Sequence, residues 1–140
     1  MSEYVSNMEV KEAYCSYEVS KLLKEKGFDE PCECFYDSEN NDVSIVNGWM
    51  NISNSELEER EFLCYSAPTH QMACAWIRKK GWHISIQLTY DENYNTVYYV
   101  TISSTKTLLA EDIGELDTKY FSKVEDANNE ALKYSLENLI

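Results

Sequence analysis

Strict alternation of apolar and polar residues marks one stretch of the chain, residues 82–90. This pattern is typical of a β-strand that has one covered face and one face in contact with solvent. We expect the covered face to hold Trp82, Ile84, Ile86, Leu88 and Tyr90. The polar face would then hold His83, Ser85, Gln87 and Thr89.

A second alternating segment, residues 97–103, follows after a short polar loop. Two such segments joined by the loop 91–95 predict an antiparallel hairpin. Tyr94 would lie at the tip of this hairpin, and Tyr99 would lie on its polar face beside Gln87. The apolar face would continue through Tyr98, Val100 and Ile102.

Two helices are indicated by a capping residue at the start and a glycine at the end. The first is expected over residues 16–26, where Ser16 supplies the N-terminal cap. The second is expected over residues 69–80, where Thr69 can cap and Gly81 ends the helix. The buried face of the second helix would hold Met72, Ala73 and Trp76.

A third helix is expected over residues 122–140. Ser122 and Glu125 have the spacing of a capping box at its start. Apolar residues spread along one side of this helix, so its last turn is expected to dock on the core. These residues are Val124, Ala131, Leu132, Leu136 and Leu139.

The remaining segments carry weaker patterns. Short strands are expected over residues 32–36 and 43–46, and a brief one over 120–121. Residues 47–60 mix polar residues with a few apolar anchors, which indicates an irregular segment. Residues 4–14 fit either a helical extension or an edge strand, and the pattern leaves both open.

Together these elements predict a single domain over residues 1–140 of the α+β class. The expected architecture is a two-layer sandwich. Its sheet would be mostly antiparallel, with three to five strands, and the three helices would pack on one face. A chain of this length can bury a core without metals or disulfides.

Composition adds a strongly acidic character. The chain has 25 acidic and 12 basic residues, a net charge of -13. A field of this sign repels phosphate groups, so we expect no nucleic-acid partner and no membrane partner. No apolar run is long enough to span a membrane, and the N-terminus lacks the pattern of a signal peptide, which favours a cytoplasmic location. The five cysteines are an odd number, which favours free thiols over a disulfide framework.

The charge is also unevenly distributed. Residues 62–110 contain four basic and two acidic residues, a balance of +2, whereas the other residues carry 8 basic and 23 acidic, a balance of -15. The basic residues Arg78, Lys79 and Lys80 fall at the end of a predicted helix, where the helix dipole favours cations.

Three segments resemble a known group of proteins. They are residues 16–28, residues 67–73 with Trp76, and residues 130–140. In these segments the chain resembles short proteins from gut Bacteroides genomes and their phages, a group with no established activity. The resemblance implies a phage-related or mobile-element protein of bacterial cytosol, and it supplies no site residues.

The surface left without a structural role is the most promising functional candidate. His83, Gln87, Tyr94 and Tyr99 are expected on the polar face and tip of the hairpin. Tyrosine provides a large amphipathic contact area at low entropic cost. We therefore expect a non-catalytic accessory or interaction module that binds a protein partner or self-associates, with no cofactor and no metal.

Two alternatives remain open from the sequence. His70 and Cys74 lie four residues apart on a predicted helix, and with His83 they could form a small thiol-dependent or zinc-dependent enzyme. Alternatively, the acidic surface could mimic a nucleic acid and inhibit a host enzyme.

Overall fold

The computed structural model describes residues 13–37, 43–45, 51–106 and 119–140. Within these ranges it contains four helices and five strands, so the predicted α+β class is confirmed. The helices are α2 (Tyr17–Glu25), α3 (Asn54–Glu59), α4 (His70–Lys79) and α5 (Val124–Asn138). The strands are β1 (Cys34–Asp37), β2 (Val43–Ile45), β3 (Cys64–Ser66), β4 (Trp82–Tyr90) and β5 (Thr96–Ser104).

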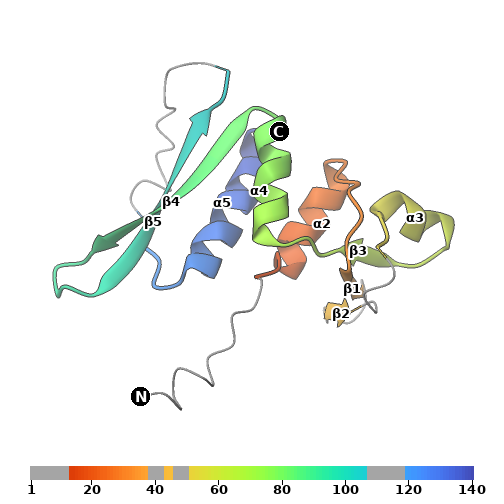
Figure 1. Ribbon diagram of the computed structural model, residues 1–140, viewed down its shortest axis with the longest axis horizontal. Helices are drawn as coiled ribbons and strands as arrows, with labels where there is room; N and C mark the ends of the chain where they lie inside the picture. Colours follow the sequence, from red (N-terminus) through yellow and green to blue (C-terminus); the bar gives the residue numbers. More distant parts are fainter. Residues whose placement is uncertain (1–12, 38–42, 46–50, 107–118) are drawn as a thin grey trace, which may run out of the picture.

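The described strands form two separate antiparallel sheets. One has the order β2-β1-β3, and the other is the β4–β5 hairpin. Figure 1 shows the two sheets on opposite sides of the helices α2, α4 and α5. The single sheet of three to five strands expected from the sequence is therefore not what these strands form. Alternation identifies a strand, but it does not determine which strand lies beside it.

The starts of α2 and α4 agree with the predicted caps. The Ser16 hydroxyl accepts the Val19 N–H at 3.2 Å, and the Thr69 hydroxyl accepts the Met72 N–H at 3.1 Å. Gly81 follows α4 with a φ of 109°, a conformation that glycine adopts at little cost. The two predicted helices thus have the expected boundaries to within one residue.

The start of α5 differs from the prediction. Its N-cap is Lys123, which makes no side-chain capping hydrogen bond, so the capping box expected from Ser122 and Glu125 is not formed. The brief strand expected over residues 120–121 appears as a single antiparallel bridge between Phe121 and Tyr98.

The main core lies between the hairpin and three helices. Residues of α2, α4, α5, β4 and β5 form one buried cluster, and α5 contributes Ala131, Leu132 and Leu136 to it. Leu139 is partly buried against the same cluster, as expected. Val124 was expected on this buried side but is 36% exposed, because it lies in the first turn of α5, at the edge of the packed region.

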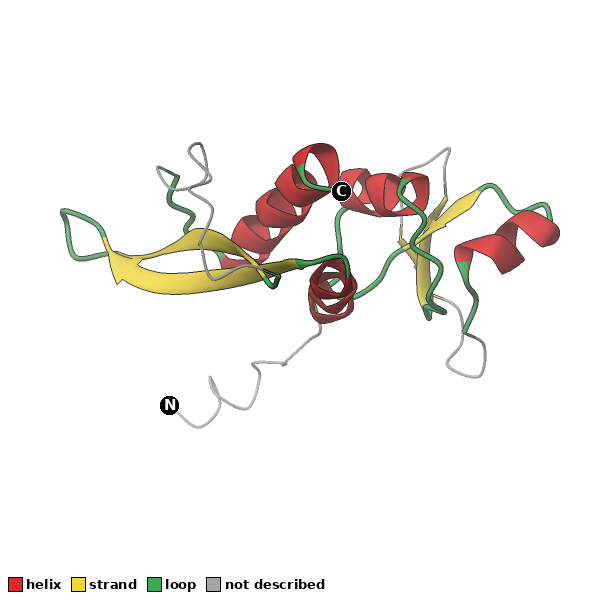
Figure 2. Ribbon diagram, turned by 90° about the horizontal axis from the view of Figure 1, so that it is seen from above, coloured by secondary structure: helices red, strands yellow, loops and turns green. Residues whose placement is uncertain are grey.

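The far half of the hairpin lies outside this core. Ile84 is 8% exposed, whereas Leu88 is 57% exposed and Tyr90 is 64% exposed, although all three lie on the same face of β4. Figure 2 shows the hairpin projecting past the helices. The expectation that Leu88 and Tyr90 belong to the core is therefore wrong, because the covering helices do not extend to the end of the strand.

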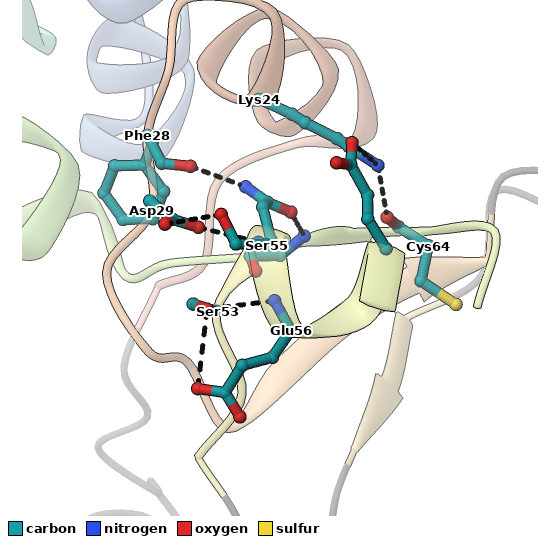
Figure 3. A network of polar contacts seen from close by, with 10 residues as sticks. Lys24, Phe28, Asp29, Ser53, Ser55, Glu56 and Cys64 are labelled. Carbon is teal, nitrogen blue, oxygen red and sulfur yellow. Dashed lines mark hydrogen bonds and ion pairs between the residues drawn. The ribbon is translucent and has the colours of Figure 1, made fainter. Parts of the chain in front are cut away.

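The second sheet is joined to the rest by polar contacts around α3, a helix that the sequence did not predict. Asn54 donates from Nδ2 to the Phe28 carbonyl at 2.8 Å and accepts the Ser66 N–H at 3.0 Å. Asp29 accepts both the N–H and the hydroxyl of Ser55 at 2.7 Å. Figure 3 shows these hydrogen bonds, which connect the start of α3 to the loop after α2 and to β3.

Some expectations fall on residues that the structure does not describe. The open segment from Tyr4 to Tyr14 lies outside the described residues except for its last two positions. Tyr14 forms an isolated antiparallel bridge with Thr69. In the described part of the chain, no helix is both long and apolar enough to cross a membrane.

Candidate functional site

The hairpin tip carries three exposed apolar or aromatic side chains. These residues are Leu88, Tyr90 and Tyr94, and we call them the hairpin end. Tyr94 is 87% exposed, the highest value among the exposed large apolar side chains in the described part of the chain. A cluster of this kind at the end of a projecting hairpin is accessible to another molecule.

The loop that presents Tyr94 is held by one carboxylate. Asp91 Oδ1 accepts the N–H groups of Asn93 and Asn95, each at 2.9 Å. The Tyr94 N–H donates to the Asp91 carbonyl at 3.0 Å. The hydrogen bonds from Asn95 and Asn93 lower the pKa of Asp91, which favours its charged form. The loop therefore has a defined conformation, although its surface is exposed.

Tyr94 itself has an unfavourable backbone conformation. Its φ is 63°, in the left-handed region that favours glycine and asparagine. A residue with a Cβ loses about 1 kcal/mol there relative to its normal conformation. Because the side chain is almost fully exposed, packing within the chain does not compensate for this cost.

The other predicted site residues do not gather around Tyr94. Gln87 and Tyr99 are directly opposite each other in the β4–β5 register, as expected. His83 lies near the other end of β4, about 25 Å from the loop for a strand of this length. The structure thus places Gln87 and Tyr99 together and separates His83 and Tyr94.

Each of the three residues on the polar face has a contact within the chain. Arg78 Nε donates to His83 Nδ1 at 3.3 Å, and Gln87 Nε2 donates to the Ser85 hydroxyl at 2.7 Å. The Tyr99 ring packs edge to face against Tyr120, with 6.4 Å between the centroids. Tyr120 was not among the predicted site residues, and it is itself exposed.

A cavity of about 310 Å³ lies between the first turns of α4 and α5. It contains the residues of the predicted thiol–imidazole pair, His70 and Cys74. The other residues that line it from these helices are Gln71, Val124, Glu125 and Asn128. His83 does not line this cavity, so the three residues of the enzymatic alternative are not brought together in it.

The chemistry of the cysteines does not favour nucleophilic catalysis. Burial raises the pKa of Cys74 to about 11 and that of Cys32 to about 12. Burial also raises the pKa of Cys15 and Cys64. These thiols therefore remain protonated at neutral pH, whereas the thiolate is the reactive form.

The described residues also contain no cluster suited to a metal ion. No three histidine, cysteine, aspartate or glutamate side chains among them lie close enough to hold one. All five cysteines are free.

His70 has a structural role that the sequence did not reveal. Its Nε2 lies 3.2 Å from Asn129 Oδ1, which also accepts the Ser16 N–H at 2.9 Å. An amide oxygen only accepts, so His70 Nε2 carries the proton in this arrangement. The contact joins the starts of α2 and α4 to the middle of α5.

Acid is expected to weaken the fold through His70. Its burial lowers its pKa below the ordinary 6.5, so the unfolded chain binds the proton more readily than the folded chain. The stabilisation is complete above pH 6.5 and is lost as the pH falls toward the folded pKa. Urea unfolding measured between about pH 8 and pH 5 should show this decrease.

A substitution at His70 identifies the group that causes this decrease. The decrease should be smaller in His70→Gln than in the wild type, because glutamine does not titrate. Equal pH dependence in the wild type and His70→Gln would show that carboxyl groups cause the effect.

No protein-family model matches the chain, and neither a curated protein nor a solved structure does so.

Proposed function

We propose that this protein is a small non-catalytic interaction module whose hairpin end contacts another protein. The observation that carries the proposal is Tyr94, an aromatic residue with a φ of 63° and an exposure of 87%. A glycine at this position would relieve the backbone cost. Backbone strain of this kind is common at binding sites, where the side chain has a role outside the fold.

The neighbouring side chains support a protein surface as the partner. Leu88 and Tyr90 add exposed apolar area next to the loop, and aromatic residues are enriched in protein interfaces. The hairpin strands carry no aspartate, glutamate, lysine or arginine between Trp82 and Tyr90 or between Thr96 and Ser104. An uncharged apolar contact suits another protein better than a phosphate-rich nucleic acid.

We further propose that the protein is a single domain that acts in the cytoplasm as an accessory protein of a phage or mobile element, without a cofactor. The raised pKa of Cys74 supports a non-catalytic role, because the best-placed thiol in the cavity is not activated.

The substitution Tyr94→Gly tests the proposal. It should leave folding intact or raise the free energy of unfolding by about 1 kcal/mol, because glycine tolerates the loop conformation. It should also reduce the recovery of the bound partner by about tenfold or more, as expected for an interface residue of this type. Recovery can be measured by affinity capture from cells of the source organism, followed by mass spectrometry.

Phe62→Ser provides a matched control. Phe62 is 50% exposed and follows α3, away from the hairpin. This variant should recover the same partner as the wild type. A partner that remains bound to Tyr94→Gly, or a set of captured proteins that is identical for all three forms, would contradict the proposal.

A further inference from the structure

The outer edge of β4 has backbone groups that the described chain leaves unpaired. The Thr105 N–H donates to the Gly81 carbonyl, and the Asp91 N–H donates to the Asn95 carbonyl. These two bonds show that Gly81 and Asp91, at either end of β4, are hydrogen-bonded positions. Such positions recur at every second residue of an antiparallel pair, so the odd-numbered residues of β4 bond to β5. The even-numbered residues, from Trp82 to Tyr90, direct their N–H and C=O groups outward. No described strand pairs with this edge.

We propose that β4 pairs antiparallel with β4 of a second copy of this chain, about a two-fold axis at Ile86. This inference rests on the proposed role of the hairpin as a contact surface and names a second copy as a partner. The pairing joins two hairpins into a four-stranded sheet. An open edge of nine residues is long enough for such strand addition.

The sequence of β4 is self-complementary in this register. Ile86 lies opposite Ile86 of the partner subunit, and Ile84 lies opposite the partner's Leu88. Trp82 lies opposite the partner's Tyr90, so each apolar side chain has an apolar neighbour across the new pair. The exposed Leu88 and Tyr90 thereby lie beside residues at the covered end of the second copy. Each pair away from the axis occurs twice, because Ile84 of either copy faces Leu88 of the other. A two-fold interface requires this reciprocity.

The charges at the two ends of β4 favour the same arrangement. The loop after the strand carries Asp91 and Glu92, whereas Arg78, Lys79 and Lys80 precede the strand. In the proposed register, Glu92 lies opposite the partner's Lys80. The acidic loop of each copy therefore lies next to the basic helix end of the other.

Further positive charge lies at the same end of the strand. A Cβ atom added to Gly81 would lie 3.0 Å from Lys106 Cε, so Lys106 lies over the position opposite the partner's Asp91. The strand itself contains no aspartate, glutamate, lysine or arginine, so two copies of an acidic chain can approach along it. A parallel pairing would place like charges together, and this favours the antiparallel arrangement.

Sedimentation equilibrium across the micromolar range tests whether the wild-type chain forms a dimer. Amide exchange followed by NMR then tests the edge. The amides of Ile84, Ile86 and Leu88 should be protected at high concentration and should exchange at least about tenfold faster after dilution. The amides of Ser85 and Gln87 bond to β5 and should be protected at both concentrations.

Two variants with matched controls test the register. Glu92→Lys should raise the dissociation constant about tenfold, because each interface then contains two repulsive contacts in place of two attractive ones. Glu59→Lys makes the same change of net charge on α3 and should not weaken the dimer. Leu88→Lys should weaken the dimer at least about tenfold, whereas Phe62→Lys should not.

The charge variants separate a local contact from general repulsion. If only general repulsion between two acidic copies mattered, Glu92→Lys would strengthen the dimer, because the variant chain is less acidic. A monomer at all concentrations, or an Ile86 amide with no added protection, would overturn the inference. Equal effects of Glu92→Lys and Glu59→Lys would overturn it as well. If the chain is monomeric but Tyr94→Gly still loses its captured partner, the proposed function stands without this inference.

Discussion

Removal of residues 136–140 is expected to lower the melting temperature by about 10 °C. Leu136 is fully buried, and Leu139 and Ile140 pack against the same core cluster. The deletion removes this apolar contact and exposes the surfaces of α2 and α4 that α5 covers. The loss of Leu136 alone should cost about 3 kcal/mol, as for other buried leucines. Circular dichroism during heating measures the change.

Two single substitutions identify the cause of this change. Leu136→Ala should account for most of the loss, because it leaves the helix intact and removes only the buried side chain. Glu137→Ala, on the exposed side of the same turn, should change the melting temperature by no more than about 2 °C. An unchanged transition in the deleted chain would show that the last turn of α5 does not stabilise the core.

The elements that the sequence predicted best are those whose ends are determined locally. The hydroxyl of Ser16 caps α2 and that of Thr69 caps α4, and each bond spans only three residues. Glycine supplies the left-handed conformation after both helices, at Gly27 and Gly81. The hairpin was predicted for the same reason, since its two strands are joined by a short loop.

The elements that the sequence missed depend on distant partners. The helix α3 has six residues, too few to be stable alone, and its start is held by Asp29, which lies 26 residues before Ser55. The strand β3 has three residues and pairs with β1 across a long stretch of chain. No periodic pattern in so short a segment can indicate these contacts.

The candidate site was predicted in part, and the differences have a physical explanation. Alternation indicated that Leu88 and Tyr90 share a face with Ile84, but not that the covering helices would end before them. Those two residues therefore belong to the hairpin end and not to the core. Similarly, the spacing of His70 and Cys74 suggests a ligand pair, but the contact of His70 with Asn129, 59 residues away, gives His70 a role in joining helices.

Replacement of Asn54 by alanine is expected to lower the free energy of unfolding by about 3 kcal/mol. The Asn54 side chain is buried and forms two hydrogen bonds. Its amide nitrogen donates to the Phe28 carbonyl, and its amide oxygen accepts the Ser66 N–H. Alanine leaves both backbone groups without a partner inside the protein, and each unsatisfied group costs about 1 to 3 kcal/mol. Because Phe28 follows α2 and Ser66 belongs to β3, the substitution should loosen the second sheet from the helices. Urea unfolding measures the loss.

The adjacent residue makes the test specific. Ser55→Ala removes an exposed hydroxyl bond to Asp29 but keeps the backbone N–H bond to the same carboxylate, so it should cost no more than about 1 kcal/mol. Asn54→Asp keeps the acceptor for Ser66 but replaces the donor to Phe28 with an oxygen, so it should be at least as harmful as alanine. If Asn54→Ala and Ser55→Ala cost the same, the buried amide would not be the link between α3 and the rest of the fold. A large loss confined to the Asn54 variants would show that this buried amide is a main contact between the second sheet and the helices, in addition to the bond from the Tyr36 hydroxyl to the Cys15 carbonyl.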